Sequence, residues 1–310
     1  MKYVLITAAR NEESFIRRTL KSVTSQTQRP ERWVIVDDGS TDNTAAVIED
    51  YAAGFPWITL IRRGNRLHRH FGGKADAINA GFQSLEAVPF DVVGNVDADV
   101  SFDPDFMEFL MQKFDADPQL GVAGTPYLEG DFDSARDSFE GEKYVAGQVQ
   151  LFRRACFKEI GGYTKSPSGG VDWIAVMTAR MRGWRTRSFD EKRFVHHRLM
   201  SSAERGVFAA YYSYGQKDYY LGGSPLWQIF RVGYRLAKKP FLIGGFAVML
   251  GYCSAALSRT HRPISVELMR FHRHHQMLKL KNIFHSLLRL KKVDNFRLET
   301  NHTGLSGPAS

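Results

Sequence analysis

The N-terminal part of the chain alternates between two hydrophobic patterns. Short apolar runs rich in β-branched residues are typical of buried strands, whereas apolar residues three or four positions apart are typical of one helix face. The patterns predict strands at 3–8, 33–36, 58–61 and 92–96, and helices at 11–26, 45–51 and 74–85. This alternation predicts a doubly wound, mostly parallel α/β sheet whose loops at the carboxyl ends of the strands meet at one edge.

The pattern becomes less regular between residues 126 and 200. Residues 127–137 are acidic and rich in turn formers, which predicts a mobile surface loop. The remaining elements expected in this stretch are strands at 145–152 and 186–189 and helices at 154–160 and 171–182. We therefore expect residues 1–200 to form a single α/β domain.

A different pattern begins after residue 200. Residues 241–257 carry no charge, and the length of this run is at the lower limit for crossing a bilayer. Residues 263–292 show the pattern of a basic amphipathic helix. Glycines within 241–257 and basic residues on both flanks favour a segment that dips into one leaflet. A buried helix pair explains the same pattern equally well. We expect 201–294 to be a helical, membrane-associated region and 295–310 to be a flexible tail.

The charge of the chain is unevenly distributed. The net charge is +9, but residues 226–310 alone hold 14 Lys and Arg against 3 Asp and Glu. Such a basic segment predicts a polyanionic partner, and no nucleic-acid-binding module is recognisable, so an anionic membrane surface is expected. The two cysteines, Cys156 and Cys253, suit a reducing compartment, and the chain opens directly on a strand pattern without a signal peptide. These features together predict the cytoplasmic face of the membrane.

Two carboxylates follow the strand predicted at 92–96. Asp97 and Asp99 are two positions apart, so in an extended backbone they point to the same side. Their charges repel each other unless a cation lies between them. A Mg²⁺ or Mn²⁺ ion held by carboxylates and completed by phosphate oxygens and water meets that need. Since Asp-x-Asp also occurs in solvated loops, the neighbouring motifs decide its meaning.

Those motifs follow one another in a fixed order. They are Thr7-Ala8-Ala9-Arg10-Asn11-Glu12-Glu13, Val36-Asp37-Asp38-Gly39-Ser40-Thr41-Asp42-Asn43-Thr44, Gly73-Lys74-Ala75-Asp76-Ala77-Ile78-Asn79-Ala80-Gly81, Asp97-Ala98-Asp99 with Pro104-Asp105, Gly161-Gly162-Tyr163, Asp172 and His196-His197-Arg198. Over residues 3–198 this series resembles inverting glycosyltransferase family 2, which has the GT-A fold. Ala8 and Arg10 replace the proline and tyrosine common in the family.

The resemblance implies a nucleotide-sugar site at these loops. It implies that Asp38 contacts the base, that Asp97 lies near the ribose and that Asp99 ligates Mg²⁺ or Mn²⁺. A carboxylate at position 38 accepts an imide N–H, which favours a uridine nucleotide. Lys74 at a helix N-terminus adds charge near the phosphates, although an ordinary solvated lysine fits as well. The donor-binding residues implied by the matched motifs are Ala8, Asn11, Glu12, Asp38, Lys74 and Asp97.

The resemblance also implies a catalytic base and a third metal ligand. Asp172 follows Ser168-Gly169-Gly170 where the family carries its catalytic carboxylate, and Val171 replaces the acid that usually precedes it. An N-cap is the structural alternative for Asp172. Adjacent histidines in an extended segment face opposite ways, so only one of His196 and His197 can face the metal. His196 is the one expected to join Asp97 and Asp99 as a metal ligand. A purely structural histidine remains the alternative.

We therefore expect an enzyme, namely a metal-dependent inverting glycosyltransferase. The donor would be a nucleoside diphosphate sugar, with a UDP-sugar favoured, and the acceptor a lipid-linked or polysaccharide chain of the cell envelope. A sugar nucleotidyltransferase is less well supported, because residues 8–13 lack its glycine-rich phosphate loop. A dinucleotide-dependent oxidoreductase would need Gly-x-Gly-x-x-Gly there. A non-catalytic membrane-binding relative fits the basic C-terminal region but leaves the acidic motifs unexplained.

Overall fold

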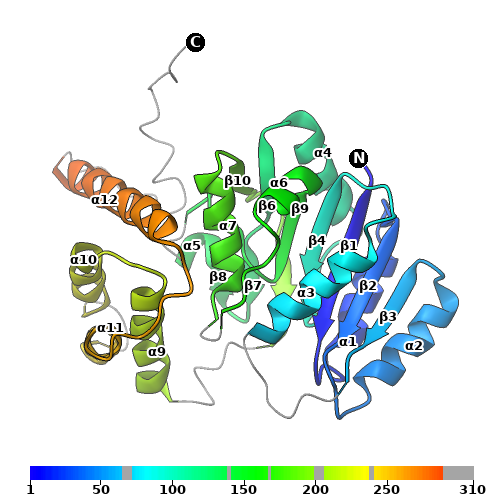
Figure 1. Cartoon of the computed structure of the whole chain (residues 1–310), viewed down its shortest axis with the longest axis horizontal. Helices are drawn as coiled ribbons and strands as arrows, with labels where there is room; N and C mark the ends of the chain where they lie inside the picture. Colours follow the sequence, from blue (N-terminus) through cyan, green and yellow to red (C-terminus); the bar gives the residue numbers. More distant parts are fainter. Residues whose placement is uncertain (65–71, 138–140, 167–168, 199–205, 237–240, 289–310) are drawn as a thin grey trace. The chain divides into compact units, whose positions relative to one another are not determined.

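The computed structural model describes residues 1–64, 72–137, 141–166, 169–198, 206–236 and 241–288. The chain divides into two compact units (Figure 1). The first, here called the N-terminal unit, comprises residues 1–167 and 171–199. The second, the helical unit, comprises residues 168–170 and 200–310. The tail predicted at 295–310 lies outside the described residues.

A seven-stranded sheet forms the centre of the N-terminal unit. Its order is β10-β6-β9-β4-β1-β2-β3, and the strand pairs that involve β9 are antiparallel while the others are parallel. The strands are β1 (Tyr3–Ala9), β2 (Arg32–Asp37), β3 (Ile58–Arg62), β4 (Val92–Val96), β6 (Leu120–Gly124), β9 (Val149–Arg153) and β10 (Arg185–Ser188). The prediction of a doubly wound, mostly parallel sheet is confirmed.

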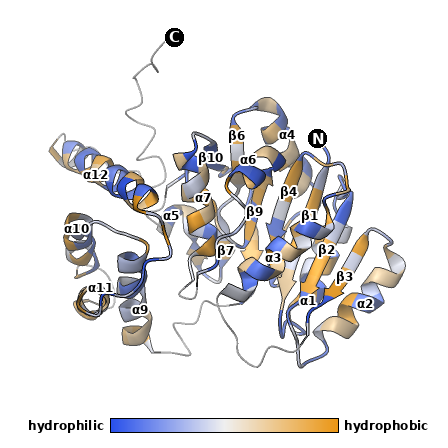
Figure 2. Cartoon of the chain, viewed as in Figure 1, coloured by the Kyte–Doolittle hydropathy of each residue, from blue (hydrophilic) through white to orange (hydrophobic). Residues whose placement is uncertain are grey.

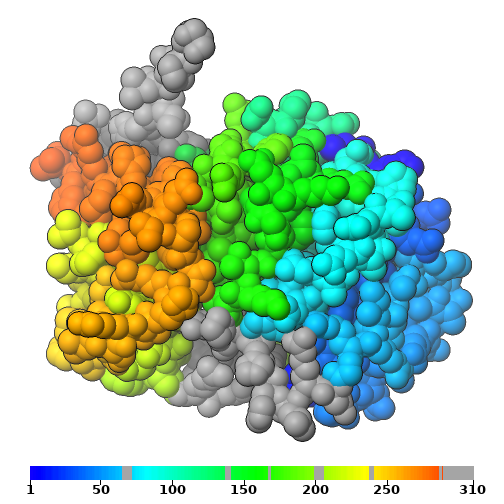
Figure 3. Space-filling model, in the orientation of Figure 1, coloured from blue at the N-terminus to red at the C-terminus, as the bar shows by residue number. Residues whose placement is uncertain are grey.

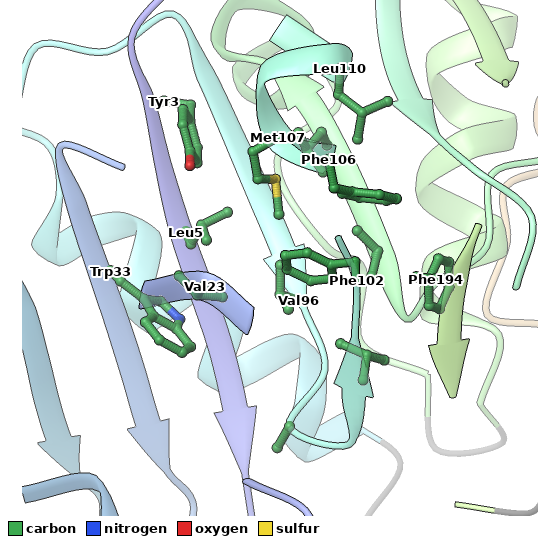
Figure 4. Close-up of a cluster of buried hydrophobic side chains, with 14 of the residues drawn as sticks. Tyr3, Leu5, Val23, Trp33, Val96, Phe102, Phe106, Met107, Leu110 and Phe194 are labelled. Carbon is green, nitrogen blue, oxygen red and sulfur yellow. The ribbon is translucent and has the colours of Figure 1, made fainter. Parts of the chain in front are cut away.

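Helices cover both faces of this sheet because alternate strand residues point to opposite faces. Tyr3 and Leu5 pack in one cluster with Phe106 and Met107 (Figure 4), whereas Ile6 packs on the other face. The first cluster takes side chains from α1 (Ile16–Thr24), α2 (Thr44–Gly54) and α4 (Phe106–Ala116), and the second from α3 (Gly72–Ser84), α6 (Arg154–Glu159) and α7 (Val171–Met181). Burial on both faces explains the nearly continuous apolar runs of β1 and β4. In the space-filling view the described residues of this unit, blue to green, form a continuous surface (Figure 3).

A second, smaller sheet corrects one expectation. Its order is β5-β11-β7-β8, with β5 at Val100–Ser101, β11 at Phe194–His196, β7 at Tyr127–Glu129 and β8 at Phe132–Asp133. The surface loop expected at 127–137 is therefore wrong, since this stretch forms two strands and the short helix α5 (Ser134–Asp137). Strand pairing with the distant β11 stabilises a segment whose own sequence contains mainly turn residues.

The helical unit contains α9 (Val207–Tyr220), α10 (Pro225–Leu236), α11 (Ile243–Leu257) and α12 (Val266–Leu288). No described helix combines the length and the apolar character needed to cross a membrane. The helix expected at 263–292 is present as α12, and hydrophobic and hydrophilic residues are interspersed along it (Figure 2). They do not separate into two faces. The amphipathic character expected of this helix is therefore not found.

Candidate active site

Three loops meet at the carboxyl edge of the large sheet. Strand β1 pairs in parallel with β2 on one side and β4 on the other, so the loops that follow these strands emerge together. They carry Asn11 and Glu12 after β1, Asp38 after β2, and Asp97 and Asp99 after β4. The edge at which ligands bind in open α/β sheets is thus lined by the acids of the predicted motifs.

The first two loops are joined by hydrogen bonds. The backbone N–H of Asn11 donates to Ser40 Oγ at 3.0 Å, and Asn11 Oδ1 accepts from the Thr41 N–H at 2.8 Å. Asn11 has a positive φ of 55°, which asparagine tolerates better than most residues. Asp37 Oδ1 accepts the Ser40 N–H at 3.1 Å. Asn11 and Asp37 therefore shape the loops that carry the other acids.

Asp38 lies beside an arginine that sequence reasoning missed. Its Oδ1 is 3.4 Å from Arg63 Nη1, and both atoms are buried without a hydrogen-bond partner in the structure. A Cβ at Gly73 would lie 2.8 Å from Asp38 Oδ2, so a larger residue there would displace this carboxylate. An ion-paired acceptor and donor that have no hydrogen-bond partner suit a flat ligand carrying complementary groups. Arg63 directly follows β3, and that position at the sheet edge is the signal that could have identified it.

Lys74 is an ion-paired residue of this edge and not a solvated surface lysine. Its Nζ lies 2.6 Å from Asp97 Oδ1 and 2.9 Å from Oδ2, and it donates to the Gly147 carbonyl at 3.2 Å. Burial opposes the charge on Lys74, but Asp97, Asp172 and Asp99 together raise its pKa. Burial raises the pKa of Asp97, although Lys74 counteracts the shift. The α3 N-terminus thus brings one cation to the first acid of the motif.

Asp99 contacts two other cationic or ionisable side chains. Arg198 Nε donates to Asp99 Oδ2 at 3.2 Å, and His196 Nε2 lies 3.4 Å from the same oxygen. The Asp99 side chain is only 10% exposed. Burial alone would raise the pKa of Asp99, but the hydrogen bonds and charges of His196 and Arg198 lower it. Asp99 is therefore held in its charged form.

The two adjacent histidines point in different directions. His196 Nδ1 lies 2.7 Å from Glu129 Oε2, whereas His197 contacts Ser101 Oγ at 2.7 Å and Arg18 at 2.9 Å. Burial opposes protonation of His196, but Asp99 and Glu129 raise its pKa. Burial and the charge of Arg18 lower the pKa of His197. Only His196 therefore faces the acids, as the alternation of an extended segment requires.

Glu12 completes the group through Arg198, which it contacts directly. Burial, together with the nearby charges of Asp99 and Asp97, raises the pKa of Glu12 to about 7, although Arg198 acts in the opposite direction. Its backbone N–H donates to Thr44 Oγ1 at 2.7 Å. Ala8 lies one position before the end of β1, and its side chain is partly buried against the core cluster that includes Ile6.

Asp172 reaches the same region from α7. It lies in the first turn of that helix, one residue inside its start, and not at the N-cap. A Cβ at Gly147 would lie 2.4 Å from Asp172 Oδ2, so the carboxylate lies directly over this glycine. The Gly147 carbonyl accepts hydrogen bonds from Lys74 and from Asn95 Nδ2. Tyr144 Oη donates to Asp172 Oδ2 at 3.3 Å.

Comparison with known proteins identifies the family. The model of glycosyl transferase family 2 matches residues 4–168, more than half of the chain. The chain belongs to glycosyl transferase family 2. The resemblance found in the motifs is therefore confirmed, and so is the prediction of a glycosyltransferase.

Curated relatives match part of this family 2 chain. The poly-β-1,6-N-acetyl-D-glucosamine synthase of Staphylococcus epidermidis is 27% identical over 173 residues, which are 50% of this chain and 40% of that protein. The synthase of the same name from Staphylococcus aureus is 33% identical over 122 residues, 39% of this chain and 27% of that protein. The chain thus covers less than half the length of the curated relatives that it matches.

Two solved glycosyltransferase structures share the fold. The structure of S. aureus TarS 1-349 in complex with UDP-GlcNAc has a TM-score of 0.55 and 16% identity, over 96% of this chain and 90% of that one. The mannosyltransferase PcManGT from Pyrobaculum calidifontis, in complex with GDP-Man and Mn²⁺, has a TM-score of 0.54 and 19% identity, over 93% of this chain and 83% of that one. At these identities the likeness shows the fold, which is the GT-A fold expected for family 2.

The side chains of this family 2 site fit a hard divalent cation together with further ligands. Among the described residues, no three His, Cys, Asp or Glu side chains are grouped to hold a metal ion by themselves. Asp97 and Asp99 nevertheless offer carboxylate oxygens. His196 offers an imidazole whose other nitrogen contacts Glu129, as is usual for metal-binding histidines. Sequence reasoning missed Glu129, since it lies in the segment expected to be a loop.

Proposed function

We propose that this glycosyltransferase moves a sugar from a nucleoside diphosphate sugar, of the UDP-GlcNAc type, to a hydroxyl group with inversion at the anomeric carbon. The acceptor is a lipid-linked or growing polysaccharide chain of the cell envelope, handled at the cytoplasmic face of the membrane. The observation that carries the proposal is the group of Asp97, Asp99, Lys74, His196 and Arg198 at the carboxyl edge of the sheet. The names of the poly-N-acetylglucosamine synthases and the UDP-GlcNAc complex of TarS support the choice of donor.

The base of the donor is proposed to lie against Asp38 and Arg63. The Asp38 carboxylate oxygen, which has no hydrogen-bond partner, accepts the imide N–H of uracil, and the Arg63 guanidinium donates to a uracil carbonyl. Lys74, which lies in the first turn of α3, and Arg198 face the two acids and supply positive charge for the diphosphate. Each cation would exchange part of its bonding to Asp97 or Asp99 for bonding to phosphate oxygens.

Metal dependence is part of the same proposal. Asp99 and His196, with Asp97, would hold Mg²⁺ or Mn²⁺ together with diphosphate oxygens and water. When bound, the ion supplies Lewis-acid stabilisation of the departing diphosphate. The mannosyltransferase structure that contains GDP-Man and Mn²⁺ supports this part of the proposal.

Asp172 is proposed as the general base. The acceptor oxygen forms a bond to the anomeric carbon while the bond from that carbon to the diphosphate oxygen breaks on the opposite side. The proton of the acceptor hydroxyl moves to the Asp172 carboxylate, and the bonding electrons leave with the nucleoside diphosphate. The position of Asp172 over Gly147, next to the carbonyl that binds Lys74, supports this role.

The test uses the full chain with UDP-GlcNAc, an N-acetylglucosamine oligosaccharide acceptor, and Mn²⁺ or EDTA. We expect release of UDP with Mn²⁺ and its loss with EDTA. Asp172→Asn should lower kcat by about 10²- to 10⁴-fold while UDP still raises the melting temperature. Asp115→Asn, at an exposed position of α4, is the matched control. Formation of UDP-GlcNAc and pyrophosphate from UTP and N-acetylglucosamine 1-phosphate, supplied in a separate assay, would instead identify a nucleotidyltransferase. Turnover of GDP-mannose alone would reject the proposed donor.

A further inference from the structure

The helical unit exposes most of the large apolar side chains that are accessible in the protein. Seventeen large hydrophobic residues are exposed in the described part of the chain, and all except Val195 lie between Val207 and Leu288. The most exposed are Ile229 at 70%, Leu288 at 80% and Leu257 at 86%. Single exposed apolar residues are ordinary, but a concentration of them marks an interaction surface.

Helix α11 has its large and small residues on opposite faces. Its outer face, which is exposed, consists of Ile243, Phe246, Met249, Leu250, Cys253 and Leu257. Its inner face, which is buried, consists of Gly244, Gly245, Ala247, Val248, Gly251 and Ala255. A helix of a water-soluble protein normally buries its large apolar residues and exposes polar ones. Helix α11 shows the reverse arrangement.

The inner face of α11 packs closely against α9. A Cβ at Gly251 would lie 2.0 Å from the Tyr212 carbonyl oxygen, and one at Gly215 would lie 2.0 Å from the Val248 carbonyl oxygen. Ala247, Gly251 and Ala255 recur at intervals of four. Small residues at this spacing let helix backbones approach each other in lipid, where large side chains face the acyl chains. The packing of α9 and α11 is therefore suited to a lipid environment.

The charge of the helical unit complements anionic headgroups. Its described residues include nine Lys and Arg but only two acids, Asp218 and Glu267, and Asp218 pairs with Arg231. Arg259 and Arg262 lie in the segment between α11 and α12. Basic residues next to an apolar helix attract anionic lipids and thereby hold the helix at a negatively charged membrane surface.

The length of α11 limits how it can lie in a bilayer. Its 15 residues span about 22 Å, compared with about 30 Å for the hydrocarbon core. We propose that α11 lies in the plane of the membrane, with its outer face among the acyl chains of one leaflet of an anionic phospholipid bilayer. This proposal deepens the localisation stated above but does not depend on the transferase reaction.

Cys253 provides a direct probe of this surface. It is exposed on the outer face of α11, whereas Cys156 is buried and burial raises the pKa of its thiol to about 12. A polarity-sensitive fluorophore can therefore be attached selectively to Cys253 of the folded full chain. With vesicles of phosphatidylglycerol and phosphatidylcholine, its emission should shift to shorter wavelength. Nitroxide groups in the acyl chains should quench it more strongly than nitroxide groups on the headgroups.

The matched control is the double variant Ala53→Cys and Cys253→Ser, which carries the same fluorophore on α2, where Ala53 is exposed. Its emission should not respond to vesicles. An unchanged emission of the Cys253 label in anionic vesicles would overturn the proposal. So would a blue shift that needs no vesicles and accompanies a doubled mass in solution, because the outer face would then join two copies of the chain.

Substitutions of Phe246 test how much the outer face contributes to membrane binding. Phe246→Asp should weaken binding to anionic vesicles at least about tenfold, since a phenylalanine is lost from the acyl region. Ala53→Asp adds the same charge on α2 and should have little effect. Phe246→Ser gives the same test without a charge if the aspartate variant does not fold. Turnover of UDP-GlcNAc in detergent separates this outcome from a failure of the transferase proposal.

Discussion

The two units of this protein use apolar residues in opposite ways. In the N-terminal unit, large side chains such as Trp33, Phe106 and Phe152 are fully buried. In the helical unit, the close contact between α9 and α11 involves Gly215 and Gly251, and most large residues of α11 face outward. The hydrophobic effect can account for both arrangements if the surfaces of the two units face different surroundings. Apolar side chains are buried inside the protein where its surface faces water, and they stay on the surface where that surface can face lipid.

The largest effect is expected at the acids of the N-terminal unit. Asp99→Asn should lower UDP release by on the order of a thousandfold, because the preorganised charge that stabilises the departing diphosphate is reduced. Turnover measured with saturating Mn²⁺ checks this result. Asp115→Asn should retain wild-type turnover. Equal turnover of Asp99→Asn and wild type would show that the reaction does not occur at the carboxyl edge of the large sheet.

The packing of the helical unit is tested by enlarging one glycine. Gly251→Val should destabilise the contact of α9 with α11 by about 3 kcal/mol, because its Cβ would overlap the Tyr212 carbonyl. Hydrogen exchange in detergent should show faster exchange in both helices. Gly54→Val, where a Cβ would have no neighbour within 4 Å, should leave exchange of α9 and α11 unchanged. If Gly251→Val also leaves exchange unchanged, the contrast in packing between the units is wrong.

A smaller effect is expected when the partner of His196 is changed. Glu129→Gln should raise the Mn²⁺ concentration for half-maximal activity by about 10- to 100-fold, because the imidazole loses the carboxylate that orients it. The affinity for UDP without metal should stay the same. Glu31→Gln, just before the start of β2 and beside Lys2, is the control. A fall in kcat at saturating Mn²⁺ with no change in metal requirement would contradict the positioning role of Glu129.

The smallest effect concerns pH. The pKa of Glu12 is about 7 in the folded protein, compared with 4.5 for an ordinary glutamate, so between these values the folded state keeps a proton that the unfolded state releases. Stability from this group is thus present at low pH and is lost as the pH rises. From pH 6 to 8 the loss should be roughly 1 kcal/mol relative to Glu12→Gln. Urea unfolding of both proteins in EDTA measures the difference, and parallel stability curves would reject the shift.

Local patterns predicted the large sheet well and the small sheet poorly. Strands such as 92–96 and the helices at 74–85 and 171–182 are identified by their own residues, and the structure has β4, α3 and α7 there. The pattern assigned no element to 106–124, where the structure has α4 and β6. Strands β7 and β11 are joined by pairing between distant segments, which no local pattern reveals, whereas β8 forms a short local hairpin with β7.

The same distinction applies to the site. The acids that follow β1, β2 and β4 come together because parallel strands end at one edge, which the alternation of elements predicts. The contacts of Glu129 with His196 and of Arg198 with Asp99 join residues 67 and 99 positions apart. Arg198 lay inside a recognised motif, but nothing in its neighbours indicated that it reaches both Asp99 and Glu12.

The register of the small sheet has a consequence for how this enzyme can diversify. His196 is paired with Val100, one residue after Asp99, so two residues of the site are fixed by a single strand ladder. The connections that lead into and out of β11 can therefore change in length or sequence while the histidine keeps its distance from the acid. Insertions after residue 198 could therefore add new acceptor-binding segments, while the proposed donor-binding residues would keep their positions.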